Sequence, residues 1–102
     1  MSFHKVAEPD ELSGDGVIAV SVGDLSIALT RFEGKYGALS GRCPHAGGPL
    51  AEGEIDFGVL ICPWHGREFH PLTGECQSHA EHLVTYAVEE REDGIYVEVP
   101  DS

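Results

Sequence analysis

Two short stretches in the middle of the chain each carry one cysteine and one histidine. Cys43-Pro44-His45 places these side chains two positions apart, and Cys62-Pro63-Trp64-His65 places them three positions apart, with sixteen residues between the stretches. Thiolates and imidazoles are both good ligands for transition metals. The pattern therefore predicts one metal site with four ligands, which are Cys43, His45, Cys62 and His65.

The residues around both ligand pairs favour tight loops. Pro44 and Pro63 restrict φ directly after each cysteine, and Gly66 permits an unusual φ just beyond the second histidine. Each pair also follows a strand-like run, over residues 36–42 and 58–61. We therefore expect two similar loops that leave the ends of two strands and face each other across a gap.

The order of the ligands bears on which metal they hold. Two thiolates and two imidazoles suit either tetrahedral zinc or an iron–sulfur centre. Zinc modules usually gather their ligands as Cys-x2–4-Cys and His-x3–5-His, whereas this chain alternates one Cys and one His in each loop. In this respect the sequence resembles the Rieske family, whose pattern is Cys-x-His followed roughly sixteen residues later by Cys-x2-His.

The resemblance extends beyond the ligands. Gly66-Arg67-Glu68-Phe69, Leu72-Thr73-Gly74-Glu75-Cys76 and the spacing Ala80-x2-Leu83-x2-Tyr86 are similar to the stretches that follow the second motif in Rieske ferredoxins. The family implies an all-β Rieske iron–sulfur fold, an antiparallel β sandwich with a cluster-binding β subdomain at one tip. It also implies a single domain over residues 1–102, with that subdomain at about 40–82 and a basal β domain built from the flanking segments.

The same resemblance implies the cofactor and its ligands. Each chain would hold one [2Fe-2S] cluster, with one iron bound by Cys43 and Cys62 and the other by His45 and His65. Two neutral imidazoles in place of two thiolates make the site less negative, which raises its reduction potential above that of an all-cysteine site.

Departures from the high-potential Rieske proteins point to the ferredoxin branch. Those proteins carry two further loop cysteines joined in a disulfide, at positions that correspond here to Gly48 (or Gly47) and Trp64. They also carry a Ser and a Tyr that donate hydrogen bonds to the cluster, where this chain has Arg67 and Phe69. Fewer donors stabilise the reduced cluster less, so the resemblance implies a low-potential member associated with oxygenases.

The flanking segments predict strands. Residues 17–22 and 25–29 alternate apolar side chains around Gly23-Asp24, and residues 84–89 and 95–99 do the same around Asp93-Gly94. Alternation around a Gly/Asp pair is typical of a β-hairpin. Since no segment shows sustained helical spacing, the pattern independently favours an all-β domain.

Charge and length limit the possible partners. The 102 residues suit one domain, and 18 acidic against 6 basic residues give a formal net charge of -12. Such a charge disfavours nucleic acid and anionic membranes, and it indicates either simple solubility or steering toward a basic docking patch. There is no apolar run of the ~20 residues that a membrane helix needs and no signal peptide, so we expect a cytoplasmic protein.

Three residues near the ligands receive separate interpretations. Cys76 is expected to be a small, semi-buried side chain and not a ligand. Trp64 is expected to pack under the loops. His79 stands where the family usually has a proline, in a loop that covers the cluster, and is the one further histidine with a possible effect on it.

The function that follows is electron transfer without catalysis. The chain would accept one electron from a flavin-containing or iron–sulfur reductase. It would pass that electron to a terminal oxygenase, such as an aromatic-ring-hydroxylating dioxygenase, or to another redox acceptor. Three alternatives remain open: a Rieske-like small subunit of an assimilatory nitrite reductase, a domain that accompanies a larger catalytic chain, and a structural zinc-binding interaction module.

Overall fold

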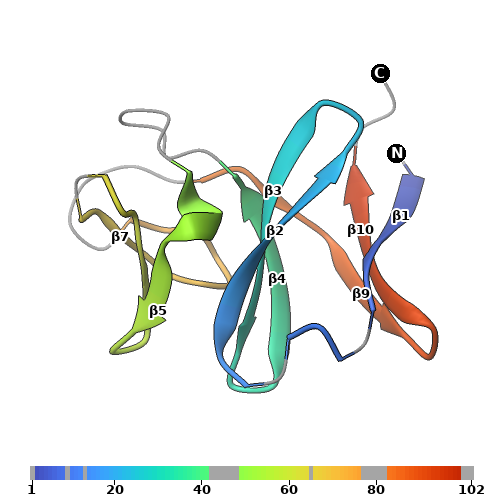
Figure 1. Ribbon diagram of the computed structural model, residues 1–102, viewed down its shortest axis with the longest axis horizontal. Helices are drawn as coiled ribbons and strands as arrows, with labels where there is room; N and C mark the ends of the chain where they lie inside the picture. The colour runs from blue at the N-terminus through green and yellow to red at the C-terminus, as the bar shows by residue number, and fades with distance from the viewer. Residues whose placement is uncertain are drawn as a thin grey trace.

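The computed structural model describes residues 2–8, 10–12, 14–41, 49–64, 66–76 and 83–99. Over these ranges the chain forms short antiparallel strands and a single turn of 3-10 helix (Figure 1). In chain order they are β1 (Ser2–Ala7), β2 (Gly16–Val22), β3 (Leu25–Phe32), β4 (Lys35–Ser40), η1 (Leu50–Glu52), β5 (Glu54–Asp56), β6 (Val59–Ile61), β7 (Glu68–Phe69), β8 (Thr85–Tyr86), β9 (Val88–Arg91) and β10 (Gly94–Val99).

A four-stranded sheet in the order β2-β3-β4-β8 forms the centre of the molecule. Its first hairpin joins β2 to β3, with Val22 opposite Leu25 and Gly23 at a φ of +59° in the turn. Glycine adopts such an angle without steric cost, which is why the Gly-Asp pair favours this turn. The hairpin predicted over 17–29 is confirmed.

Strands β3 and β4 separate two hydrophobic cores. Ala28 lies opposite Leu39 in the register of these strands, and Leu29 lies opposite Ala38. Because residues paired across strands share a face and successive residues alternate, the first pair faces one core and the second pair the other. All four side chains are buried, and each pair belongs to its own apolar cluster.

Each face of the central sheet is covered by a different layer. The sheet β1-β10-β9 covers one face and contributes Ile95, Val97 and Val99 to that core. The small sheet β5-β6-β7, together with η1, supplies Leu50, Leu60 and Phe69 to the other core. In Figure 1 the small sheet lies to the left of the central strands and the β1-β10-β9 sheet to the right. The antiparallel, all-β architecture predicted from the sequence is confirmed.

The second predicted hairpin differs in one respect. The run over 84–89 is not one strand, because Thr85 pairs with Leu39 in the central sheet whereas Val88 pairs with Val97 in the outer sheet. Between them the carbonyl of Ala87 accepts a hydrogen bond from Glu98 N, at 2.9 Å. The chain thus crosses from one sheet to the other at Ala87, and side-chain alternation alone does not indicate which sheet each half joins.

Within the residues that the structure describes, no helix is long and apolar enough to cross a membrane.

Candidate metal centre

The second of the two predicted ligand loops begins at Cys62, directly after β6. Its side chain is only 1% exposed. The Cys62 N–H donates to the carbonyl of Arg67 at 2.9 Å, and the Cys62 carbonyl accepts from Gly66 N at 3.0 Å. Gly66 has a φ of +70° and open space where a Cβ would lie, so glycine is needed here for its backbone angle. The result is a tight turn closed on a buried thiol; His65 lies outside the described residues.

Cys43 and His45 also lie outside the described residues, but the residues on either side of them, Gly41 and Leu50, are described. Gly41 donates its N–H to Ser26 O at 2.9 Å, and its carbonyl accepts from Leu50 N at 3.0 Å. A Cβ on Gly41 would overlap the Ser26 side chain, so only glycine permits this close approach. Gly41 and Leu50, which stand on either side of the ligand-bearing stretch, are therefore joined directly by a hydrogen bond.

A similar hydrogen bond joins residues on the two sides of the segment 77–82. The Leu83 N–H donates to the carbonyl of Gly74 at 2.9 Å. Gly74 has a φ of +76°, and a Cβ there would lie 3.0 Å from the Leu83 Cβ, so both its angle and its surroundings require glycine. The expectation for His79 falls within 77–82, outside the described residues.

The residues that flank these three stretches pack in one hydrophobic core. Residues at or beside them, Leu50, Cys62, Cys76 and Leu83, belong to a single cluster of buried side chains whose members also include Leu60 and Phe69. The described residues that flank 42–48 and 77–82 thus belong to one apolar core, which we call the platform. Thiolate is the form of cysteine that binds metal, and a buried Cys62 held by two backbone bonds is fixed in place before any iron arrives. The described part of the site, with a buried thiol held by two backbone hydrogen bonds, therefore fits an iron–sulfur cluster.

A buried hydrogen bond links the residues next to the platform to the central sheet. The Thr30 hydroxyl, in a fully buried residue of β3, donates to the carbonyl of Pro71 at 2.6 Å. Gly37 makes room for it, since a Cβ there would lie 2.7 Å from Thr30 Oγ1. A buried carbonyl without a partner is costly, so this bond ties the turn that follows β7 to the central sheet.

His70 has a positioning role that the sequence did not reveal. Its Nδ1 accepts hydrogen bonds from Leu72 N at 3.1 Å and Thr73 N at 3.2 Å, and its ring meets that of Phe32 edge to face at 6.2 Å between centroids. No role was assigned to His70 from the sequence. Asn, Asp and Ser commonly cap turns in this manner, whereas a histidine gives no such signal.

The structure bears on two further expectations from the sequence. Cys76 is 7% exposed and packs in the platform core, which confirms that it is a small buried side chain. The expectation that Trp64 packs under the loops is wrong, because its side chain is 57% exposed. Cys62 already fills the interior position where this turn begins, and the chain then leaves the core, so both Pro63 and Trp64 are exposed.

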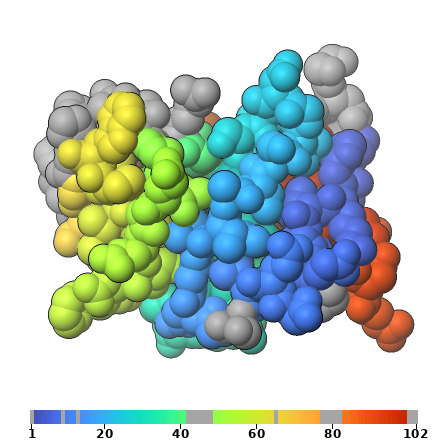
Figure 2. All heavy atoms as spheres, viewed as in Figure 1, coloured from blue at the N-terminus to red at the C-terminus, as the bar shows by residue number. Residues whose placement is uncertain are grey.

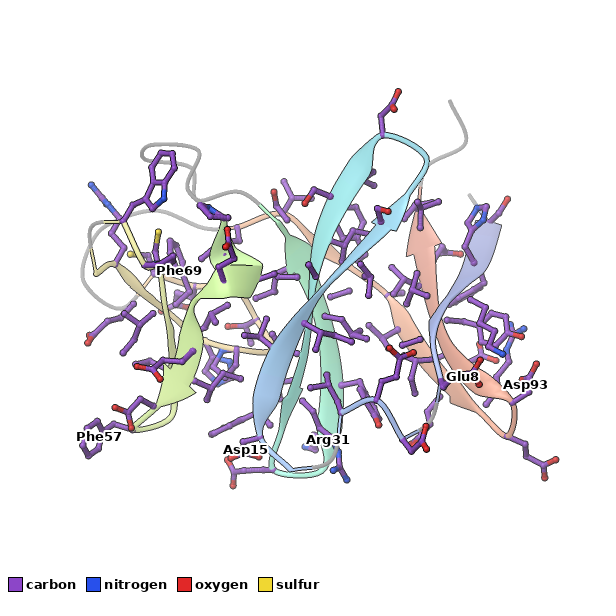
Figure 3. The ribbon with its side chains drawn as sticks, viewed as in Figure 1. Glu8, Asp15, Arg31, Phe57, Phe69 and Asp93 are labelled. Atoms are coloured by element: carbon purple, nitrogen blue, oxygen red, sulfur yellow. The ribbon has the colours of Figure 1, made fainter. Side chains whose placement is uncertain are left out.

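Apart from that of Lys5 on β1, whose pKa is raised by its contact with Glu8, the clear pKa shifts among the described residues lie on the β9–β10 hairpin that carries Asp93 (Figure 3). The Tyr96 hydroxyl donates to Asp93 at 2.8 Å, which lowers the pKa of the carboxyl and raises that of the phenol. Arg91 lies 4.1 Å above the Tyr96 ring, and its Nε is 2.7 Å from the Glu89 carboxylate, which raises the pKa of Arg91. These groups stabilise the hairpin end and do not act on the cluster site.

Comparison with known families identifies the class of protein. The model of the Rieske [2Fe-2S] domain matches residues 2–87 of the chain. This chain belongs to the Rieske [2Fe-2S] domain family, and its cofactor is a [2Fe-2S] cluster.

Individual relatives include both electron carriers and larger enzymes. The chain is 31% identical to the 3-phenylpropionate/cinnamic acid dioxygenase ferredoxin subunit of Photorhabdus laumondii, with 74% of each chain covered. It is 34% identical to the nitrite reductase [NAD(P)H] of Emericella nidulans, over 98% of this chain and 10% of that protein. Among solved structures, it matches a chain in the complex of reduced oxygenase and oxidized ferredoxin of carbazole 1,9a-dioxygenase. That match has a TM-score of 0.83 and 28% identity, covering 93% of this chain and 91% of that one.

The relatives differ greatly in length. The chain spans only 10 to 16% of the length of three larger curated relatives. In those proteins the matching segment is one part of a much longer polypeptide. Similarity to that segment therefore says nothing about the activity of the rest of the relative.

Proposed function

We propose that the chain is a one-electron carrier of a multicomponent oxygenase system and is not itself an enzyme. It accepts an electron from a flavin-containing or iron–sulfur reductase and passes it to the terminal oxygenase component. The observation that carries this proposal is that the match extends over most of both chains. It covers 74% of a dioxygenase ferredoxin subunit and 91% of a chain in the oxygenase–ferredoxin complex. Domains embedded in large enzymes give no such match.

The ligand set is part of the same proposal. Cys43 and Cys62 bind one iron, and His45 and His65 bind the other. Support comes from the burial of Cys62 and from the base of the segment 42–48, which is pinned between Gly41 and Leu50. When bound, the cluster supplies the reversible uptake of one electron. Residues from about 40 to 82 act as the cluster-binding subdomain, and the flanking strands serve as its base.

The chain's own residues hold and shield this centre. The turn over 62–67 fixes the Cys62 thiol, and the apolar platform under it excludes water from the side that faces the core. Phe69 is fully buried and lacks a hydroxyl, so it contributes no hydrogen bond that would favour the more negative, reduced state. A potential toward the low end of the Rieske range follows. A cytoplasmic location also belongs to the proposal, since metal-binding thiols suit a reducing compartment.

A reconstituted electron-transfer chain tests the proposal. The purified, cluster-loaded protein is mixed with NAD(P)H and catalytic amounts of candidate flavin reductases from the same genome, and loss of the oxidised absorption is followed. Reduced protein is then mixed with candidate oxygenase components, and its reoxidation is followed together with product formation. We expect rapid reduction by one reductase and reoxidation by one oxygenase, with no turnover by the carrier alone.

A second candidate, the electron-transfer part of a nitrite reductase system, is favoured by the 34% identity to the fungal nitrite reductase. The same assay separates the two functions. Reoxidation by a nitrite reductase component with formation of reduced nitrogen, and no transfer to any oxygenase, would replace the oxygenase assignment.

Salt dependence is expected to reveal whether the acidic surface steers docking. With a formal net charge of -12, attraction to a basic partner is screened beyond about 8 Å at physiological ionic strength. The second-order rate of reduction by the reductase should therefore fall steeply as salt rises from low concentration. Stopped-flow measurements at several salt concentrations check this, and a rate independent of salt would leave the acidity as a solubility trait.

A further inference from the structure

Phe57 is the most exposed large apolar side chain among the described residues. It is 96% exposed at the tip of the β5–β6 hairpin, where Asp56 and Val59 flank a two-residue turn. Figure 3 shows it pointing away from the body of the protein, and Figure 2 shows the hairpin projecting at the lower left. The phenyl ring therefore has almost no contact with the rest of the fold.

The backbone at this residue is unfavourable for phenylalanine. Phe57 has a φ of +51° and Gly58 a φ of +79°, which define a turn that requires left-handed angles at both positions. Asn, Asp or Gly serve best there, and for a bulky residue the left-handed region costs roughly 1–2 kcal/mol. One exposed apolar residue is ordinary by itself. Here, however, the residue adds strain and buries no surface, so neither the turn nor the core accounts for a phenylalanine.

Every charged side chain on the hairpin that carries Phe57 is acidic. Residues 49–64, which we call the acidic arm, contain three carboxylates and no Lys or Arg. Glu54 and Asp56 are exposed on the strand next to Phe57. A shallow hollow of about 220 Å³ continues the arm toward the cluster loop and is lined by Glu52, Gly53, Glu54, Ile61 and Pro63. An aromatic tip beside carboxylates is complementary to an apolar pocket with a basic rim.

We propose that Phe57 is an anchor that inserts into an apolar pocket of a redox partner, whose rim carries Lys or Arg facing Glu54 and Asp56. This inference rests on the proposed function, because the partner is the reductase or the oxygenase. Gly58 and the three residues of β6 separate the anchor from Cys62, and β6 alone spans about 10 Å. Contact at the hairpin tip and along the hollow that reaches Pro63 thus brings the partner alongside the turn that begins at Cys62. A second copy of the chain is a poor occupant, because two acidic arms repel each other.

Variants of the cluster-loaded protein test the anchor. Phe57→Asn removes the ring and supplies a residue that the turn favours, whereas Phe57→Leu keeps an apolar side chain. Glu33→Asn is the matched control, since Glu33-Gly34 forms the same kind of turn between β3 and β4, with φ of +52° and +80°. Rates are measured against carrier concentration with the reductase and the oxygenase identified by the transfer assay above.

For Phe57→Asn we expect the KM for the carrier to rise about tenfold with at least one of the two proteins. That is about 1.4 kcal/mol, a typical cost for truncating an aromatic anchor. Its kcat, visible spectrum and thermal stability should not fall. Phe57→Leu should recover much of the wild-type KM, and Glu33→Asn should match wild type. Neutralising Glu54 and Asp56 together should raise the KM, whereas neutralising Glu90 and Glu92 on the remote hairpin should not.

Two results would overturn the anchor. One is an unchanged KM with both proteins for Phe57→Asn. The other is a wild-type dimer that Phe57→Asn converts to a monomer without any effect on KM, which would make a second copy the occupant. If wild-type protein exchanges electrons with no reductase or oxygenase, the proposed function itself fails and this inference fails with it, so the two failures are distinguishable.

Discussion

Cys62→Ser protein is expected to lose the [2Fe-2S] cluster entirely. The Cys62 thiol is buried at the base of a closed turn, where the proposal makes it one of two cysteine ligands to the same iron. A serine hydroxyl does not ionise near neutral pH and is a poor ligand for iron in this setting, so the protein should be purified without the visible absorption of the cluster. Cys43→Ser, His45→Ala and His65→Ala should behave in the same way.

Cys76→Ser is the matched control for this loss. It makes the same chemical change at another buried cysteine of the same core, where the side chain is 7% exposed. We expect this variant to keep its colour and its electron paramagnetic resonance signal, with at most a modest loss of stability. If Cys76→Ser bleaches the protein while His65→Ala does not, the ligand set is wrong.

Phe69→Ala is expected to have the largest effect on stability. Phe69 is fully buried in the platform core and pairs with Leu60 and Cys76 across the small sheet. Removing a buried ring costs about 3–5 kcal/mol, a large share of the roughly 5–15 kcal/mol that stabilises a typical domain. Urea unfolding of the cluster-free protein, with the midpoint compared at constant slope, measures this loss without a contribution from iron.

Phe57→Asn, in contrast to Phe69→Ala, is expected not to lower the free energy of unfolding, although it also replaces a phenylalanine. Its ring is exposed and its backbone strained, so replacement should leave the free energy of unfolding unchanged or raise it. Loss of several kcal/mol at Phe57 together with no loss at Phe69 would contradict the assignment of the platform core and of the exposed tip.

The fold was largely predictable because its signals are local. Alternation around Gly23-Asp24 and around Asp93-Gly94 indicates hairpins through side-chain period and turn chemistry alone. The position of Cys62 after a strand was predictable for the same reason. The crossing of the chain between sheets at Ala87 was not, since both halves of the run from 84 to 89 have the same alternation and only tertiary packing assigns them to different sheets.

The support of the site was harder to predict than its ligands. The bond from Thr30 to Pro71 joins residues 41 positions apart, and no pattern in the sequence connects them. His70 acts as a turn cap through a nitrogen that sequence rules do not associate with capping. Trp64, which stands between Cys62 and His65, was expected to pack under the loops, but its place in an outward turn after Cys62 exposes it.

Nitrogen coupling to the reduced cluster shows whether histidines bind the iron, as expected if Cys43, His45, Cys62 and His65 are the four ligands. Protein grown with ¹⁵N-labelled histidine is reduced and examined by pulsed electron paramagnetic resonance, alongside iron and sulfide analysis. We expect two irons and two sulfides per chain and coupling to two histidine nitrogens in the wild-type protein, whereas His45→Ala and His65→Ala should give no cluster signal at all. A colourless protein that contains zinc, or a cluster with no histidine coupling, would contradict this ligand set.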